Sequence, residues 1–422
     1  MSEEAQAGAN GAAGEDYDPF EVFDTSTGAG AVRDPWPVFA RLRAASPVYE
    51  GMLSEAFGLP PMLESAISAG SRLFAAVSYD SVSQLLLDPE TFSSTGYAKA
   101  MGLVFGHSIL EMDPPEHRRY RSALQQAFTL KAMERWENDI VRPIVDRRID
   151  AMIGRDRADL VRDLTFPFPL EVISAMMGLP EDDLPKFHRL AVELISISVN
   201  IERGLLASEK LREYFAEILA KRRVEPRDDL ISMLAQGELE DGQKLTDDDV
   251  FAFLRLLLPA GAETTYRSSS NLLCGLLQDP AQLEALRADR SLMRQSIEEG
   301  LRWEPPLTSI ARNAMRDAEL CGVPIPKDSV VTVCMGSANH DPARWDEPDR
   351  FDIFRPQKPH ISFATGPHTC LGLHLARMET AVALNALFDR LPNLRLDPEA
   401  EDVHITGLTF RAPRALPVVF DA

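Results

Sequence analysis

Hydrophobic positions recur at helical spacing over most of the chain. Between residues 115 and 303, and again near the C-terminus, apolar side chains return every three or four positions, which predicts amphipathic helices. The predicted helices cover 36–46, 79–87, 116–128, 131–154, 168–178, 184–199, 206–223, 228–236, 247–278, 280–287, 291–303 and 371–390. Short segments rich in β-formers predict strands at 73–78, 319–321, 329–334 and within 403–418. The pattern therefore predicts a mainly α fold with a minor β region, of α+β type.

The N-terminal 18 residues have a different composition. They are mostly Ala, Gly, Glu and Asp, with neither a basic start nor an apolar stretch, which predicts a disordered tail and no export signal. The most apolar run, 256–262, is far shorter than the roughly 20 residues of a membrane span, so no membrane anchor is expected. Because no linker divides the remaining chain, we expect residues 19–422 to form a single domain.

Composition and charge exclude several classes of protein. The 422 residues are 45% hydrophobic and 26% charged, as in folded soluble proteins. Lys and Arg number 44 against 65 Asp and Glu, and the net charge of −21 repels phosphate backbones, so nucleic acid is a poor partner. The cysteines at 274, 321, 334 and 370 stand far apart, which favours reduced thiols and a cytoplasmic location.

One cysteine lies in a loop suited to ligand chemistry. Residues 363–372 read Phe-Ala-Thr-Gly-Pro-His-Thr-Cys-Leu-Gly, and a strong helix follows Cys370 directly. A thiolate at a helix N-terminus is stabilised by the helix dipole and the free N–H groups, which suits a metal ligand. Two other interpretations remain open on spacing alone: a buried apolar cysteine, or a zinc site with His368 and His374 that lacks further close ligands.

This loop resembles the haem-binding signature of the cytochrome P450 family, F-G-x-G-x-H-x-C-x-G. Nine of the ten positions are compatible, and the departure is Ala364, where the family usually has glycine. The resemblance implies a cytochrome P450 fold in one large haem-binding domain, with a smaller β region near the N-terminus. It also implies haem b with Cys370 as the axial thiolate and iron ligand, and Phe363 and Gly372 beside the cofactor.

A second motif lies in the long helix predicted at 247–278. Residues 258–265 read Leu-Pro-Ala-Gly-Ala-Glu-Thr-Thr, and Pro259 and Gly261 should break the helix beside an acid and an alcohol. Such a pair can relay protons, although an exposed Glu followed by threonines bonded to the backbone is the plainer interpretation. The string resembles the family's oxygen-activation motif. That resemblance implies Thr264 as the oxygen-binding alcohol, Glu263 as the acid, and Ala260 and Gly261 against the haem and the substrate.

The resemblance also assigns structural and cofactor-binding charges. Glu299 and Arg302 share a helix face at i, i+3 spacing, and the family pattern adds Arg350, within Glu-Pro-Asp-Arg-Phe, to form a structural triad. Haem propionates need cations where they are buried. The family-like positions implied for them are His117, Arg121, Arg312 and His368.

Other segments are expected to form the substrate pocket and its surroundings. Four apolar segments, 95–112, 194–201, 307–311 and 406–410, should meet above the iron if the fold holds. The candidate substrate contacts are Val104, Phe105, Leu194, Ile197, Ala260, Ile310, Leu408 and Phe410. An insertion at about 50–72 departs from the family pattern and has no evident function.

These inferences lead to one expected function. We expect a monooxygenase that inserts one atom of O2 into a hydrophobic small molecule, with electrons from ferredoxin and ferredoxin reductase type partners. Arg118, Arg119 and Lys131 could form a basic patch for an acidic iron–sulfur protein. The alternatives are a peroxide-driven peroxygenase and a non-enzymatic haem-binding sensor or carrier. The sequence alone does not specify the substrate, its site of oxidation, the individual redox partner or the oligomeric state.

Overall fold

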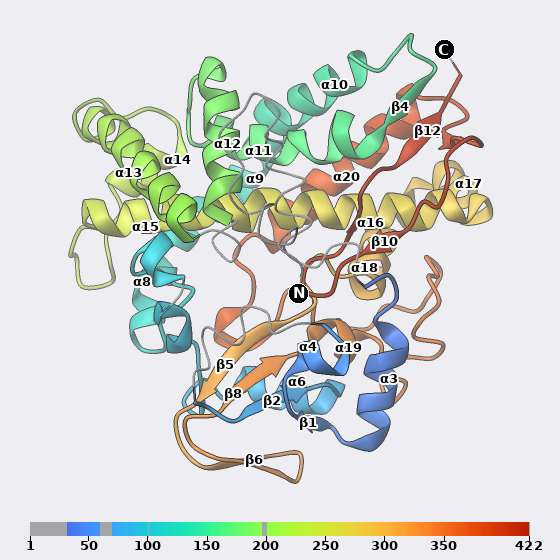
Figure 1. Cartoon of the computed structure of the whole chain (residues 1–422). Coiled ribbons are helices and arrows are strands. Elements are labelled where there is room, and N and C mark those ends of the chain that lie inside the picture. The colour runs from blue at the N-terminus through green and yellow to red at the C-terminus, as the bar shows by residue number, and fades with distance from the viewer. Residues whose placement is uncertain (1–31, 60–69, 100, 196–200, 422) are drawn as a thin grey trace, which may run out of the picture.

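A long helical rod crosses the middle of the molecule, with helices on one side and a mixed sheet on the other (Figure 1). The computed structural model describes residues 32–59, 70–99, 101–195 and 201–421. The rod consists of α15 (Asp247–Leu258), a π-helical turn (Pro259–Glu263) and α16 (Thr264–Gln278). The predicted break in the helix at 247–278 is therefore a widened turn within a continuous rod.

Most of the longer helices agree with the hydrophobic periodicity. Helix α12 (Leu184–Ile195) ends directly before residues 196–200, which lie outside the described residues. The remaining helices are α3 (Trp36–Ala45), α4 (Leu53–Ala56), α6 (Tyr79–Leu87), α7 (Gly102–Phe105), α8 (Glu116–Gln125), α9 (Leu130–Trp136), α10 (Arg142–Asp150), α11 (Pro167–Met176), α13 (Ile201–Val224), α14 (Leu230–Ala235), α17 (Pro280–Ala288), α18 (Met293–Trp303), α19 (Met335–Asn339) and α20 (Leu373–Arg390). The short helices α4, α7 and α19 were not predicted, and the segment predicted as one helix at 131–154 is divided between α9 and α10.

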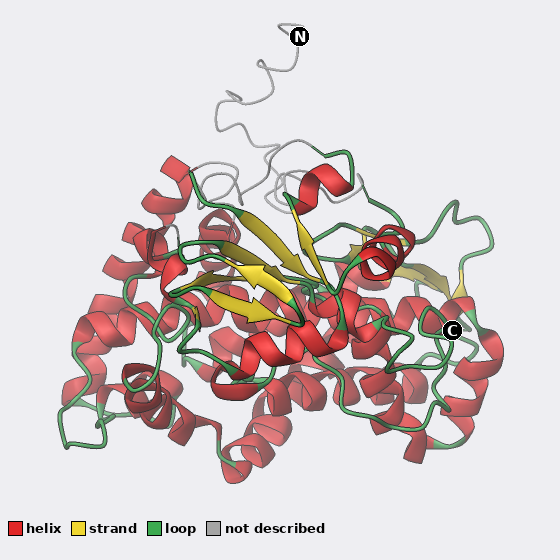
Figure 2. Cartoon of the chain, turned by 90° about the horizontal axis from the view of Figure 1, so that it is seen from below, coloured by secondary structure: helices red, strands yellow, loops and turns green. Residues whose placement is uncertain are grey.

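The main sheet joins distant parts of the chain. Its order is β1-β2-β8-β5-β3, and it lies on one face of the helical body (Figure 2). Strand β2 pairs in parallel with β8, with Phe74 opposite Val331, and antiparallel with β1. The strands are β1 (Val48–Glu50), β2 (Leu73–Ala76), β3 (Phe92–Ser93), β5 (Ile310–Ala314) and β8 (Val330–Val333).

Three smaller sheets complete the β structure. Strand β12 lies between β4 and β9, and its pairing with β4 brings the C-terminus against the middle of the chain. The strands are β4 (Arg157–Asp159), β6 (Ala318–Leu320), β7 (Val323–Ile325), β9 (Arg395–Leu396), β10 (Ile405–Thr406), β11 (Ala412–Pro413) and β12 (Pro417–Val419). The minor β region thus draws on both ends of the chain.

The expected tail at 1–18 lies outside the described residues. The described part of the expected insertion at 50–72 connects β1 to β2 and begins with α4, whose Leu53 packs with Trp36 and Phe39 of α3. No helix in the described part of the chain is long and apolar enough to cross a membrane.

Candidate active site

The Cys370 loop is a compact turn before α20. The Cys370 amide donates to the Phe363 carbonyl at 2.9 Å, and the Thr369 amide donates to the Gly366 carbonyl at 3.1 Å. Cys370 is a free thiol with an exposed side chain. Although the residue is exposed, the protein atoms packed around its thiol raise the pKa of the thiol by desolvation, while a hydrogen bond from the Gly372 backbone and the charges of Arg121 and Arg377 lower it. The helix terminus therefore does not by itself produce a thiolate, whereas coordination to a metal would.

Ala364 is the strained position of this loop. Its φ is +55°, in the left-handed region where a Cβ is unfavourable, and the family pattern has glycine here. Gly366 shows why the loop needs glycine nearby: its φ is +77°, and a Cβ would lie 2.6 Å from the carbonyl oxygen of Leu86.

We expect Ala364→Gly to stabilise the holoprotein by up to about 1 kcal/mol, because relief of roughly 1–2 kcal/mol of left-handed strain exceeds the entropic cost of glycine, roughly 0.5–1 kcal/mol. Gly366→Ala, the matched control in the same turn, should destabilise it. Denaturant unfolding followed by circular dichroism measures both. A lower unfolding midpoint for Ala364→Gly would show that the alanine is not strained.

Four basic residues gather beside the Cys370 loop. The rings of His117 and His368 lie 4.1 Å apart, and the Arg121 guanidinium donates to the Thr369 carbonyl at 2.6 Å. Arg312, at 5% exposure, is buried, and its charge reaches both histidines. The structure thus brings together the four residues that the resemblance implied for the propionates.

The electrostatics of this cluster suit a bound anion. Burial, followed by the arginine charges, lowers the pKa of His117 to about 4, and the pKa of His368 falls to about 3 for the same reasons. These shifts leave Arg121 and Arg312 as the positive charges of the cluster, with the two imidazoles beside them as hydrogen-bonding groups. Burial also lowers the pKa of each arginine, a cost that a nearby carboxylate would offset. The donor set therefore fits haem: a thiol, the buried guanidinium group of Arg312, the half-buried one of Arg121, and two imidazoles for acidic substituents.

The zinc alternative is not supported. His368 Nε2 lies 3.2 Å from the hydroxyl of Ser94, and its ring packs on His117. Within the described residues, no three His, Cys, Asp or Glu side chains form a group that could hold a metal ion.

The π-helical turn carries the acid–alcohol pair. Thr264 Oγ1 donates to the carbonyl of Ala260 at 2.7 Å. Glu263 is buried, and its Oε1 accepts hydrogen bonds from Nε and Nη2 of Arg267 at 3.0 and 2.8 Å. The rod crosses the middle of the fold (Figure 1), yet Ala260 within this turn is exposed.

Gly261 has a packing role that the sequence did not suggest. A Cβ at this position would meet Cδ1 of Ile173 at 2.7 Å, so the missing side chain allows α11 to approach the rod. Gly261 therefore contributes a close helix–helix contact on the side where a Cβ would project.

The structural triad forms with a different arginine. Glu299 and Arg302 are both buried and make a bidentate pair at 2.8 Å, as expected. The third member is Arg355, whose Nε donates to Glu299 Oε1 at 3.2 Å. Arg350 is wrong for this role, because its side chain is 60% exposed and pairs with Glu347. Only its backbone carbonyl takes part, accepting from Arg302 and Arg355.

Glu299→Ala should destabilise the holoprotein by about 3–5 kcal/mol, because it leaves two guanidinium groups uncompensated in the interior. Arg355→Ala should also be clearly destabilising, whereas Arg350→Ala should change stability by less than about 0.5 kcal/mol. Thermal unfolding and haem content measure the three variants. Equal losses for Arg355→Ala and Arg350→Ala would contradict this assignment.

The structure brings together some of the apolar candidates. Val104, Phe105 and Leu194 are buried in one cluster. The segments 307–311 and 406–410 meet through a bridge between Leu307 and Phe410 and a hydrogen bond from the Thr308 amide to the Thr409 carbonyl. Ile197 lies outside the described residues.

Two other apolar candidates belong to different surroundings. Ile310, in β5, packs against the core of the main sheet. Leu408 is wrong as a substrate contact, because it is buried with Trp36 and Phe39 in the cluster around α3. Its neighbours are thus core residues of the N-terminal region.

The expected basic patch is only partly available. Arg118 and Lys131 are exposed, but Arg119 pairs with Asp241.

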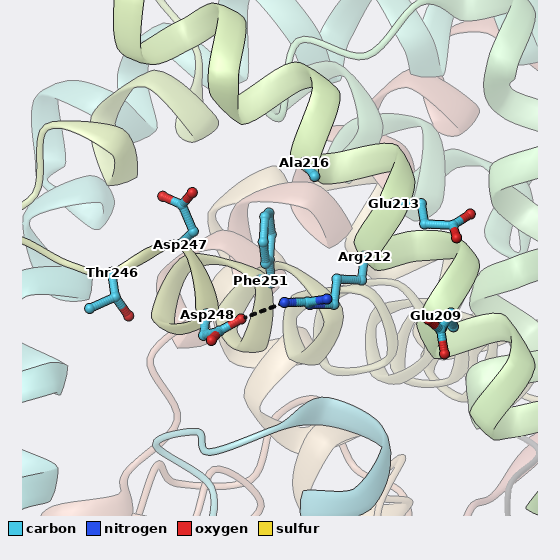
Figure 3. A pocket seen from close by; sticks show the side chains of 8 residues that line it. All are labelled: Glu209, Arg212, Glu213, Ala216, Thr246, Asp247, Asp248 and Phe251. Atoms are coloured by element: carbon cyan, nitrogen blue, oxygen red, sulfur yellow. Dashed lines mark hydrogen bonds and ion pairs between the residues drawn. The ribbon is translucent and has the colours of Figure 1, made fainter.

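A surface hollow of about 430 Å³ lies elsewhere, between α13 and the start of α15 (Figure 3). It is lined by Glu209, Arg212, Glu213, Ala216, Thr246, Asp247, Asp248 and Phe251. The Arg212–Asp248 ion pair of 3.1 Å crosses this acidic hollow, which does not suit an apolar ligand.

Glu379 of α20 is a buried acid that the sequence analysis missed. Its exposure is 1%, and neither carboxyl oxygen has a hydrogen-bond partner of normal geometry in the described part of the structure. Burial raises the pKa of Glu379 well above its usual range, although Thr265 partly offsets this effect. Burial therefore favours the neutral, protonated form of Glu379.

We expect Glu379→Gln to stabilise the holoprotein more at pH 8 than at pH 5. As pH rises above about 4.3, the unfolded state loses this proton while the folded state keeps it, so wild-type stability falls. Glutamine does not titrate, so above the raised pKa the variant gains about 1.4 kcal/mol of stability relative to the wild type for each unit by which the pKa is raised. Urea unfolding at both pH values is the measurement. A variant effect that is equal at pH 5 and pH 8 would show that Glu379 is ionised.

Comparison with known proteins places these features in a wider group. The cytochrome P450 family model matches residues 186–406. The chain is 34% identical to the cytochrome P450 monooxygenase PikC of Streptomyces venezuelae over 91% of each chain. It also resembles CYP109E1 from Bacillus megaterium in complex with testosterone (TM-score 0.81, 29% identity, covering 92% of this chain and 100% of that chain). P450BioI in complex with acyl carrier protein ligated to hexadec-9Z-enoic acid is similar as well (TM-score 0.81, 31%, 92% and 98%).

Proposed function

Because the chain belongs to the cytochrome P450 family, whose members bind haem through a cysteine thiolate, we propose that Cys370 is the axial ligand. The protein is a cytochrome P450 monooxygenase, an oxidoreductase that uses O2 and a redox partner. We infer that residues 19–422 form one haem-binding domain. The haem is of b type in this proposal, because the cysteine spacing includes no C-x-x-C-H attachment motif.

The observation that carries the proposed mechanism is the acid–alcohol pair in the π-helical turn. Haem, when bound, supplies the one-electron and O2 chemistry. Thr264 Oγ1 donates its proton to the Ala260 carbonyl, so the oxygen lone pairs remain directed toward water or substrate-side donors. Glu263, next in the chain, exchanges protons with this hydroxyl through water. This arrangement favours monooxygenation over a peroxygenase, because peroxide needs no such relay.

We propose that Arg121, Arg312, His117 and His368 bind the haem propionates, and that Phe363, Gly372 and Ala260 lie beside the haem. The substrate is a hydrophobic small molecule held near Val104, Phe105, Leu194 and Phe410, since these candidates are apolar. Electrons come from a ferredoxin and its reductase, attracted by Arg118 and Lys131.

The function is tested by supplying the holoprotein with either an electron donor or peroxide. The probes are testosterone and corticosterone, which are bound in CYP109E1 structures, and hexadec-9Z-enoic acid, which is ligated to the acyl carrier protein in the P450BioI complex. Shifts of the haem absorption band identify the probe that binds. We expect an oxygenated product with NADPH, ferredoxin, ferredoxin reductase and O2. Product with peroxide alone, and none with the electron donor, would establish the peroxygenase instead.

A further inference from the structure

Arg267 lies one turn beyond Glu263 on α16. Its exposure is 0%, and a guanidinium group in the interior needs a counter-charge. Glu263 provides it, with Nη2 and Oε1 2.8 Å apart. Nε and Nη2 of Arg267 each donate a hydrogen bond to Oε1, so the guanidinium group holds this oxygen of the carboxylate.

The guanidinium group also contacts two aromatic rings. Its central carbon lies 5.0 Å from the centroid of Tyr266 and 5.5 Å from that of Phe410, within the range of cation–π attraction. Tyr266 packs edge-on against Phe166 at 5.3 Å, before α11. The position of Arg267 therefore depends on the C-terminal loop and on the helices above the rod.

Phe410 is held by a rigid turn. Gly407 has φ +110°, and a Cβ there would lie 2.0 Å from the carbonyl oxygen of Phe410, so only glycine fits. The bridge from Phe410 to Leu307 fixes the other side of the turn. Because the turn is fixed, a ligand that contacts the Phe410 ring affects the position of Arg267 and not the conformation of the loop.

We propose that Arg267 is a positioning residue that holds Glu263 as a carboxylate with Oε1 fixed, and that it links this orientation to Phe410 of the substrate pocket. A substrate in the pocket then changes proton delivery, because its contact with Phe410 affects Arg267, which in turn positions Glu263. This inference rests on the proposed role of Glu263. The protons come from solvent, and Arg267 keeps its own proton throughout.

The first test replaces the guanidinium group. Arg267→Gln should lower the product formed per NADPH oxidised by about tenfold, a part of the factor that a proton relay contributes. The binding constant of the best probe should change by less than about twofold, since no contact of Arg267 with the ligand is needed. Arg267→Lys keeps the charge and should recover most of the coupling. A purely structural role would lower stability in Arg267→Gln and leave coupling unchanged.

Thermal unfolding gives a readout that does not depend on activity. Glu263→Gln leaves Arg267 buried without its counter-charge and should lower the melting temperature more than the double variant Glu263→Gln/Arg267→Gln does. A double variant less stable than Glu263→Gln would overturn the pairing.

The link to the pocket is tested with Phe410→Leu. We expect this variant to lower coupling in the wild-type background and to have no further effect in Glu263→Gln. Leu408→Val, in the same turn but packed around α3, is the matched control and should act equally in both backgrounds. Additive effects of Phe410→Leu and Glu263→Gln would overturn the link. Peroxide release is measured with and without the probe, so the result does not depend on one ligand.

The outcomes separate this inference from the function on which it rests. If Thr264→Ala and Glu263→Gln uncouple the reaction but Arg267→Gln does not, the positioning role is wrong and the proposed function stands. If none of the three changes coupling, the proton relay itself is wrong.

Discussion

Cys370→His should abolish the reduced carbon monoxide band typical of thiolate-bound haem. Imidazole is a haem ligand of different charge, so the protein can keep its cofactor while losing the electron donation that thiolate provides. Oxygenated product should fall below detection for the same reason. The measurement is the difference spectrum of reduced protein with and without carbon monoxide, with haem content determined in parallel.

Cys321→Ser is the matched control for this prediction. Cys321 is half-buried, so serine can replace it with little disturbance of the packing, whereas Cys274 and Cys334 are buried. We expect Cys321→Ser to retain both the band and the haem. A thiolate band that survives in Cys370→His would mean that another cysteine binds the iron.

Thr264→Ala should uncouple the reaction. The substitution keeps the helix, because Ala is the better helix former, but it removes the hydroxyl that donates to the Ala260 carbonyl. A proton relay typically contributes 10²–10⁴-fold, so we expect product per NADPH to fall by about 10²-fold while peroxide rises. Product, NADPH and peroxide are assayed together with the best-binding probe.

Thr264→Ser controls for the hydroxyl itself. Serine keeps the Oγ donor and loses only a methyl group, so coupling should stay within about threefold of the wild type. Unchanged coupling in Thr264→Ala would contradict the relay, and equal uncoupling in both variants would point to the methyl group instead.

The sequence predicted the helices well because most of them bury one face. The periodic segments 280–287 and 371–390 correspond closely to α17 and α20. Strand β5 was missed, because Ile-Ala-Arg-Asn-Ala has no strong β pattern and becomes a strand by pairing between β8 and β3. Strand formation there depends on partners far away in the chain.

The candidate site was predictable where its residues are close in sequence. The irregular turn near Pro259 follows from local spacing, whereas the Cys370 loop and the Glu299–Arg302 pair were assigned through short motifs that resemble those of the family. The choice of Arg355 over Arg350 does not, because both arginines lie in one loop and its path decides which turns inward. The i, i+4 spacing of Glu263 and Arg267 was a local signal that could have identified that pair.

The parallel pairing of β2 with β8 sets an order for folding during synthesis. Leu73–Ala76 can form its ladder with Val330–Val333 only after about 250 further residues have been made, which takes roughly 13–50 s at 5–20 residues per second. Until then the hairpin of β1 and β2 has an open edge on the ribosome, and such edges invite wrong pairing. The Cys370 loop emerges later still, so more than three quarters of the chain is made before any cofactor can bind.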